Sequence, residues 1–106
     1  MRPRNDGIWI IDDTARTVYA NDRMAEILGI STSELAGAHS FDFIFSDDTE
    51  DAARLFNSKK AGSLEPFRFK LRRRDGSAVS VHVQGTPLKN AAGEFTGVVG
   101  TFTEMD

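Results

Sequence analysis

The side chains of this chain that could take part in chemistry are two histidines and a short acidic run. His39 and His82 could each bind a metal ion or a haem iron, but neither has a second ligand at a recognisable spacing. We therefore interpret both as exposed polar residues. The acidic run could hold a hard cation, but acids also favour the N-terminus of a helix, where the helix dipole is positive, and we adopt that interpretation. The four acids are Asp47, Asp48, Glu50 and Asp51. The sequence thus predicts no metal site.

Several function classes are disfavoured by composition. The chain has 106 residues and no cysteine, which excludes disulfides, thiolate zinc sites and cysteine nucleophiles. The sequence contains neither a nucleophile–base pair nor a phosphate-binding glycine loop, so it does not indicate an enzyme. A net charge of −3 argues against nucleic-acid binding. One strand-like segment does carry a basic stripe, which we interpret as a solvated edge that discourages aggregation. Its members are Arg68, Lys70, Arg72 and Arg74.

The N-terminal half has the pattern of two short strands followed by helices. Asn21 is a good helix N-cap because its side chain can accept a hydrogen bond from an unpaired backbone N–H, and Gly29 stops the helix that follows. Ser31 and Glu34 have the spacing of a capping box. The predicted strands cover residues 7–12 and 17–20, and the predicted helices begin at residues 21, 31 and 47.

The C-terminal half has the pattern of three strands joined by two turns. Apolar and polar residues alternate through residues 66–74 and 77–88, and Asp75-Gly76 between them is a strong hairpin signal. A second turn at residues 90–93 leads into a last strand over residues 95–103. Two strands, then helices, then three strands predict an α+β domain in which an antiparallel sheet carries helices on one face.

In their order and spacing these features resemble a PAS domain over nearly the whole chain. The resemblance implies a five-stranded antiparallel sheet of order 2-1-5-4-3, with a ligand, when present, held between the sheet and the long helix. It divides the chain into a leader, residues 1–6, and a single domain, residues 7–106. The matching residues are Asp12, Val18-Tyr19-Ala20-Asn21, Gly29, Ser33-Glu34-Leu35-Ala36-Gly37, Asp48, Arg74-Asp75-Gly76-Ser77, Thr86-Pro87-Leu88, Gly93 and Gly97.

The resemblance also identifies a coupling point and a departure from the family pattern. The family usually ends in an Asp-Ile-Thr-like triplet that joins the last strand to an output helix. Glu104, Met105 and Asp106 stand in that place. Ala15 stands where the family usually has glycine in the first turn, and a positive φ there would cost about 1 kcal/mol.

The residues that the family's known cofactors require exclude some classes of ligand but do not identify one. The covalent flavin photoadduct is excluded because it needs a cysteine, and the lack of a histidine in residues 47–62 disfavours haem. A noncovalent flavin, a carboxylate metabolite, a fatty acid or an empty core stay open. The expected pocket residues, which are equally plausible as plain core, are Asn21, Phe41, Ile44, Leu55, Phe56, Phe69, Leu71, Val81, Val83 and Val99.

The resemblance implies a non-catalytic sensory and dimerisation module that relays binding to an output domain. That output is a histidine kinase, a cyclic-dinucleotide enzyme or a transcription regulator of a bacterial-type signalling protein. The alternative is an interaction domain with a filled core and no ligand. No signal peptide or membrane-spanning run is present, so we expect a cytoplasmic protein. We expect a homodimer through the outer sheet face, with Trp9, Ile11, Val98 and Phe102 as candidate contacts, or Ile8 and Ile10 if the opposite parity faces out.

Overall fold

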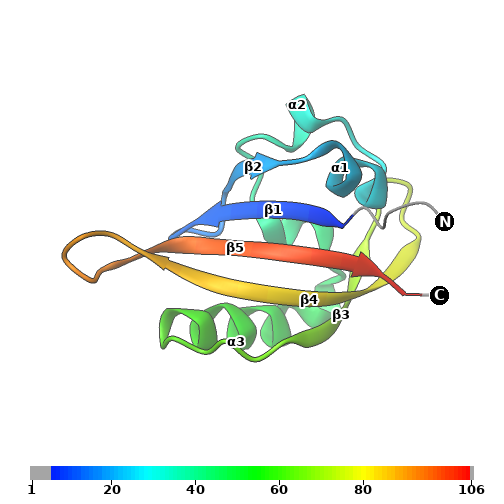
Figure 1. Cartoon of the computed structure of the whole chain (residues 1–106). Helices are drawn as coiled ribbons and strands as arrows, with labels where there is room; N and C mark the ends of the chain where they lie inside the picture. The colour runs from blue at the N-terminus through cyan, green and yellow to red at the C-terminus, as the bar shows by residue number, and fades with distance from the viewer. Residues whose placement is uncertain (1–5, 106) are drawn as a thin grey trace, which may run out of the picture.

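The computed structural model describes residues 6–105, which form one antiparallel sheet with helices packed against it (Figure 1). The strand order is β2-β1-β5-β4-β3, so the last strand lies in the centre beside the first. This confirms the predicted fold class and strand order. The strands are β1 Gly7–Asp12, β2 Thr17–Ala20, β3 Phe67–Arg72, β4 Ala78–Lys89 and β5 Phe95–Glu104.

The first two helices begin at the caps that the sequence indicates, whereas the long helix begins at Thr49 rather than at residue 47. The Asn21 side chain caps α1 by accepting from the Met24 N–H at 2.9 Å, and Gly29 ends that helix in the left-handed conformation. Ser31 caps α2 by accepting from the Glu34 N–H at 3.1 Å. The helical segments are α1 Asp22–Leu28, α2 Thr32–Leu35, η1 Ser40–Phe43, η2 Ser46–Asp48 and α3 Thr49–Lys60.

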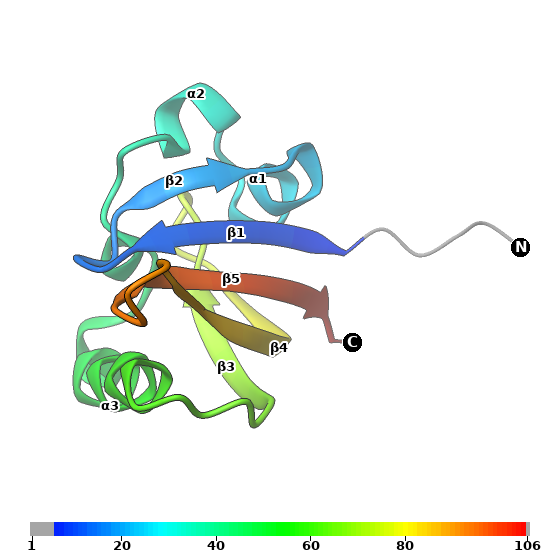
Figure 2. The same cartoon turned by 60° about the vertical axis from the view of Figure 1, so that its left-hand side comes forward.

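The helices divide the interior into two regions (Figures 1 and 2). α1 and α2 contact β1 and β2, whereas α3 contacts β4 and β5. Beneath α1 and α2 the packing is dense: the side chains of Met24, Ile27, Leu28 and Leu35 are less than 2% exposed. In α3 only Ala52 and Lys59 are buried. None of the helices in residues 6–105 has the length and apolar character needed to cross a bilayer.

The first turn keeps the backbone conformation that the family's glycine would adopt. Ala15 has φ of 65° and is almost fully buried. The Asp12 carboxylate fixes this turn by accepting from the N–H groups of Thr14 and Arg16. These hydrogen bonds, that from Arg16 first, lower the pKa of Asp12. The turn is therefore retained, and its left-handed residue is an alanine.

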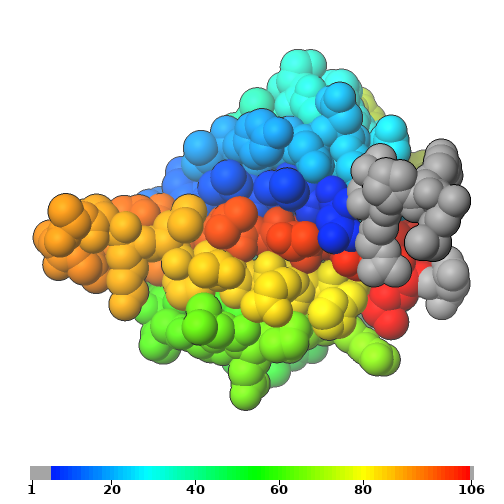
Figure 3. Space-filling view, viewed as in Figure 1, coloured from blue at the N-terminus to red at the C-terminus, as the bar shows by residue number. Residues whose placement is uncertain are grey.

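The outer face of the sheet carries a different set of residues from the one we predicted. Trp9, Ile11, Val98 and Phe102 line the interior, and Trp9 is only 4% exposed. Side chains alternate along a strand, so Ile8 and Ile10 lie on the opposite face, in register with Thr101 and Val99 of β5. Figure 3 shows this outer face, where side chains of β2, β1, β5 and β4 reach the surface. The preferred set of dimer contacts is therefore wrong, and the opposite parity faces outward.

A β-bulge in β5 explains why Val98 and Phe102 face the interior and Val99 faces outward, the reverse of the prediction. Lys89 pairs with Phe95, but Leu88 pairs with Gly97, so one extra residue of β5 lies between these two pairs. An extra residue shifts the alternation by one and turns every later side chain to the other face. Val98 therefore points inward and Val99 outward.

Candidate functional site

A cavity of about 120 Å³ lies between α3 and the concave face of the sheet. Strands β1, β3, β4 and β5, together with η1 and α3, all contribute to its wall. The wall is apolar apart from the Ser40 hydroxyl, the Lys59 side chain and the Trp9 indole. The indole N–H is already used, because it donates to the Thr17 hydroxyl at 2.9 Å. An apolar cavity with few polar groups is the usual form of a small-molecule site.

Seven of the ten predicted pocket residues line this cavity. They come from the segment around η1, from α3 and from the neighbouring strands β3 and β4. They are Phe41, Ile44, Leu55, Phe56, Phe69, Leu71 and Val83. Their use by a ligand stays a prediction.

The other three predicted pocket residues lie elsewhere. The Asn21 Oδ1 atom caps α1 and also accepts from the Ile8 N–H at 2.9 Å, so it joins α1 to β1. Val81 is fully buried in the core and does not line the cavity, and Val99 lies beyond the bulge on the outer face. The side-chain oxygen of a strong helix cap is already hydrogen-bonded to the backbone, so Asn21 could have been left out of the predicted pocket.

Two glycines of the cavity wall, Gly85 and Gly100, let neighbouring side chains lie close to the sheet, and neither was among the predicted pocket residues. Gly85 of β4 and Gly100 of β5 are paired in register, and Gly100 also pairs with Trp9 of β1. A Cβ on Gly85 would lie 3.1 Å from the Lys59 Cε, and a Cβ on Gly100 would lie 2.7 Å from Phe102 Cε1. Glycine inside a strand often marks such a close approach, and this signal was available in the sequence.

Lys59 is another wall residue outside the predicted pocket set. Its side chain is 4% exposed, and its Nζ atom donates to the carbonyls of Ser63 at 3.1 Å and Glu65 at 2.9 Å. Burial lowers the pKa of Lys59, and attraction to Glu65 opposes that shift. Its position near the C-terminus of a helix suggested an exposed residue, as neighbouring Lys60 is.

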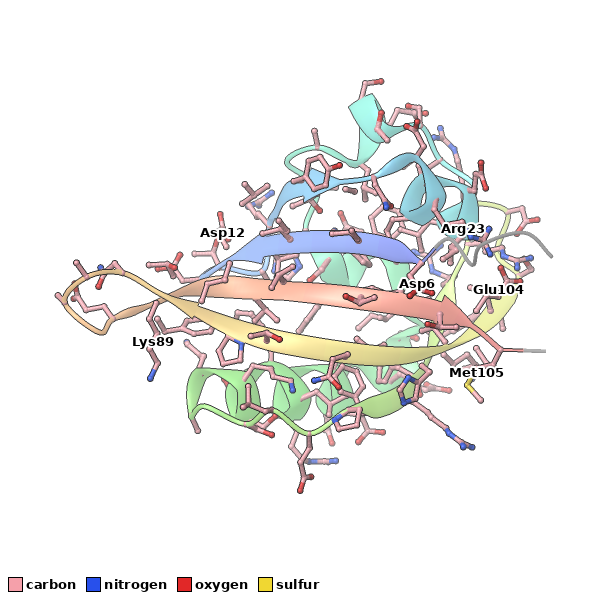
Figure 4. All side chains as sticks on the ribbon, in the orientation of Figure 1. Asp6, Asp12, Arg23, Lys89, Glu104 and Met105 are labelled. Carbon is pink, nitrogen blue, oxygen red and sulfur yellow. The ribbon has the colours of Figure 1, made fainter. Side chains whose placement is uncertain are left out.

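The predicted coupling point lies at the end of β5, where Figure 4 labels Glu104, Met105 and Arg23 of α1. The Glu104 carboxylate contacts Arg23 of α1 at 3.2 Å and Arg73 of the β3–β4 turn at 3.3 Å. The Met105 N–H donates to the Ser80 carbonyl at 2.9 Å. Asp106, the third predicted coupling residue, lies outside the described residues. Glu104 thus connects the last strand to two other elements of the domain.

The two histidines and the acidic run do not form a metal site in the described residues. His39 accepts from the Phe41 N–H through Nδ1, and His82 is exposed on β4. Within residues 6–105, no three histidine, aspartate or glutamate side chains lie close enough together to hold a metal ion.

Comparison with known proteins identifies the fold and the family. The family model described as PAS fold matches residues 5–105. The methanogenesis regulatory histidine kinase FilI of Methanothrix harundinacea is 34% identical over 100 residues, which cover 91% of this chain. The match covers 11% of the length of that kinase.

Two solved structures have the same fold. A PAS domain from Colwellia psychrerythraea matches with a TM-score of 0.86 at 16% identity, covering 94% of this chain and 86% of that one. The PAS domain of an HTR-like protein from Haloarcula marismortui has a TM-score of 0.76 at 26% identity, with coverage of 94% and 86%. From the family model and the kinase relative together, this chain belongs to the PAS family of sensory domains.

Proposed function

We propose that this domain is a non-catalytic sensor whose cavity takes a small ligand and whose last strand relays the ligand's presence to an output domain. The supporting observation is that β5 contributes to both sites. Val98, Gly100 and Phe102 lie in the cavity wall, and Glu104 follows only two residues later. A ligand that displaces Phe102 would therefore move β5 close to Glu104, and so disturb the contacts of Glu104 with Arg23 and Arg73.

The relay would work as a shift between two packings of the domain. A ligand that prefers one arrangement of α3 and β5 moves the equilibrium by its difference in affinity for the two. Couplings of this kind are usually about 1–3 kcal/mol. The contacts of Glu104 with Arg23 and Arg73 are partly exposed, so each is weak enough to be rearranged by such an energy.

We propose a histidine kinase as the output, because the relative FilI carries that name. The shared region is a small part of that protein, so a kinase activity would belong to another part of the full-length chain. A cytoplasmic location would give such a kinase access to ATP. A ligand-free interaction domain would need no cavity, and the cavity beneath α3 favours the ligand-binding alternative.

The test of ligand binding is to denature the purified domain and to analyse the released small molecules by mass spectrometry and absorbance. We expect a stoichiometric small molecule, or, where none is retained, binding of toluene detected through the fluorescence of Trp9. Trp9 is the single tryptophan of the chain and lines the cavity. If no small molecule is released and no cavity-sized probe binds, the sensor proposal fails.

The test of the relay is an NMR comparison of the backbone amides with and without a bound probe. We expect shifts at Glu104 and Met105 in addition to those at the cavity wall. Shifts confined to the wall would contradict the relay while leaving binding intact.

We also propose a homodimer through the outer sheet face, because that face exposes apolar side chains. Ile8 is 36% exposed, and Tyr19, which pairs with the outward-facing Ile10, is 51% exposed. A second copy would remove such a patch from water. Sedimentation equilibrium should show a dimer that dissociates on dilution, and an Ile8→Lys variant should be a monomer. A concentration-independent monomer mass for the unchanged chain would contradict this proposal.

A further inference from the structure

The cavity wall contains a buried cation. Lys59 is 4% exposed, and its aliphatic stem crosses Gly85, where the Lys59 Cδ and Cε atoms lie 3.7 and 3.1 Å from the position that a Cβ would take. Lysine is almost never this buried unless its charge is paired. Its location beside an apolar cavity therefore calls for an account of what balances the charge.

The described residues solvate the ammonium group without pairing it. Its two acceptors, the carbonyls of Ser63 and Glu65, are neutral, and an ammonium has three N–H donors. The Phe67 ring, which also lines the cavity, lies 5.6 Å from Nζ. None of the ion pairs formed within residues 6–105 includes Lys59. The Glu65 carboxylate attracts the ammonium from a more exposed position, without forming an ion pair with it.

The size of the cavity limits the apolar part of a ligand. Its volume is about 120 Å³. An apolar protein cavity of about 150 Å³ is known to bind benzene, whereas pockets for drug-sized ligands measure about 300–1,000 Å³. A single six-membered ring is the largest body that the enclosed space could take, and a larger ligand would have to extend through its open side.

From these observations we infer that the ligand is a small monocarboxylate with a ring-sized apolar body, oriented by an ion pair with Lys59. This inference rests on the proposed ligand-binding function and names the class of its ligand. The body would contact the apolar wall, including Phe67, and the carboxylate would take the third N–H of Nζ. A charge-assisted hydrogen bond in an apolar site is stronger than a neutral one. A neutral ligand of the same shape would leave the ammonium unpaired.

The experiment compares benzoate, benzamide and toluene as probes of the same ring size. Each is titrated into the unchanged domain, with Trp9 fluorescence and isothermal titration calorimetry as readouts. We expect benzoate to bind about tenfold or more tighter than benzamide, which is the usual effect of a hydrogen bond to a charged group. Lys59→Met keeps a long apolar stem without the charge, and we expect it to abolish this preference while toluene binding stays within about threefold.

Lys60→Met is the matched control, because it removes the same charge from the adjacent, exposed position. It should keep the preference for benzoate. If benzamide or toluene binds to the unchanged domain as well as benzoate does, the carboxylate inference is overturned and the sensor proposal stands. If none of the three probes binds, the carboxylate inference fails, and the sensor proposal fails with it when denaturation also releases no small molecule. The comparison of probes on the unchanged domain decides the inference even if Lys59→Met does not fold.

Discussion

The two halves of the interior differ in packing, although the same sheet forms the floor of both. Beneath α1 and α2, the side chains of Met24, Ile27, Leu28 and Leu35 are excluded from water and packed against β1 and its neighbours. Beneath α3 lies the cavity, whose floor contains Gly85 and Gly100 in place of side chains. One half is filled with aliphatic groups, and the other keeps space and a positive charge.

This difference indicates that stability and binding are located in separate regions of a small domain. Close packing gains dispersion energy and burial, so filled regions contribute most of the folding energy. A cavity gives up part of that energy, and a buried charge gives up more. The region beneath α1 and α2, the dense half, therefore supplies most of the stability of the domain. The region beneath α3, the hollow half, supplies less, so mutations in the two halves should have different effects on the free energy of unfolding.

The largest difference should appear when a leucine is truncated in each half. Leu28→Ala should lower the free energy of unfolding by about 3–5 kcal/mol, because it removes a fully buried side chain and leaves a new cavity. Leu55→Ala should cost only about 1 kcal/mol, since Leu55 is half-buried and already borders a cavity. Urea unfolding measures both. Equal losses would show that the two halves are packed alike.

The bulge of β5, which decides the side chains that reach the cavity, should be the next most sensitive site. A Cβ on Gly97 would lie 2.1 Å from the Ile11 carbonyl oxygen and 3.1 Å from the Asp12 Cα. Gly97→Ala should therefore destabilise the domain by about 3 kcal/mol, because only backbone can move to relieve the contact. Thermal and urea unfolding measure the loss.

Gly76→Ala is the matched control for the bulge. Gly76 also has a positive φ, 91°, but no atom lies within 4 Å of its added Cβ. Its cost should be about 1 kcal/mol, from the left-handed backbone alone. If Gly97→Ala is no worse than Gly76→Ala, the close approach of β5 to β1 does not constrain the strand.

Filling the cavity should separate binding from stability. Ala52→Leu adds three carbons to a buried residue of the cavity wall, where the space avoids the usual cost of overpacking. The free energy of unfolding should change by less than about 1 kcal/mol, whereas toluene binding, followed through Trp9, should be lost. Ala61→Leu, at an exposed position after α3, should affect neither. If the Ala52→Leu variant still binds toluene, the probe must bind outside the cavity.

The fold could be predicted because its determinants are local and sequential. Asn21 and Gly29 bound α1 in the structure as the sequence predicts, and the Asp75-Gly76 turn joins β3 to β4. With three strands after the helices, these features were enough to specify the sheet order through the family resemblance. Most of the cavity wall could also be predicted, since alternation in β3 and β4 places Phe69, Leu71 and Val83 on one face.

The parts that could not be predicted depend on registration between distant residues. The bulge at Gly97 exists because β4 and β5 pair with an extra residue, and alternation read from Phe95 onward assigns Val99 to the wrong face. Lys59 has the composition of an exposed helix end, and its burial depends on the missing side chain of Gly85, 26 positions later in the chain. No local pattern contains that relation.

The smallest expected effect concerns the charge in the hollow half and its dependence on pH. Burial lowers the pKa of Lys59 below its ordinary value of 10.5. The unfolded chain therefore holds more protons on this residue than the folded chain does, at pH values between the folded pKa and about 10.5. Stability contributed by this group should rise as pH increases through that interval, because the folded domain no longer carries a buried charge.

This contribution is measured as the difference between the unchanged chain and Lys59→Met in urea unfolding across pH 8–11. Other groups titrate in both chains and cancel, so the difference should increasingly favour the unchanged chain as pH rises. Lys60→Met, which removes an exposed charge, should give a difference that stays flat. A flat difference for Lys59→Met would mean that the ammonium is as well solvated inside the domain as in water. In that case the hollow half would hold no unbalanced charge, and a carboxylate would have no reason to be preferred there.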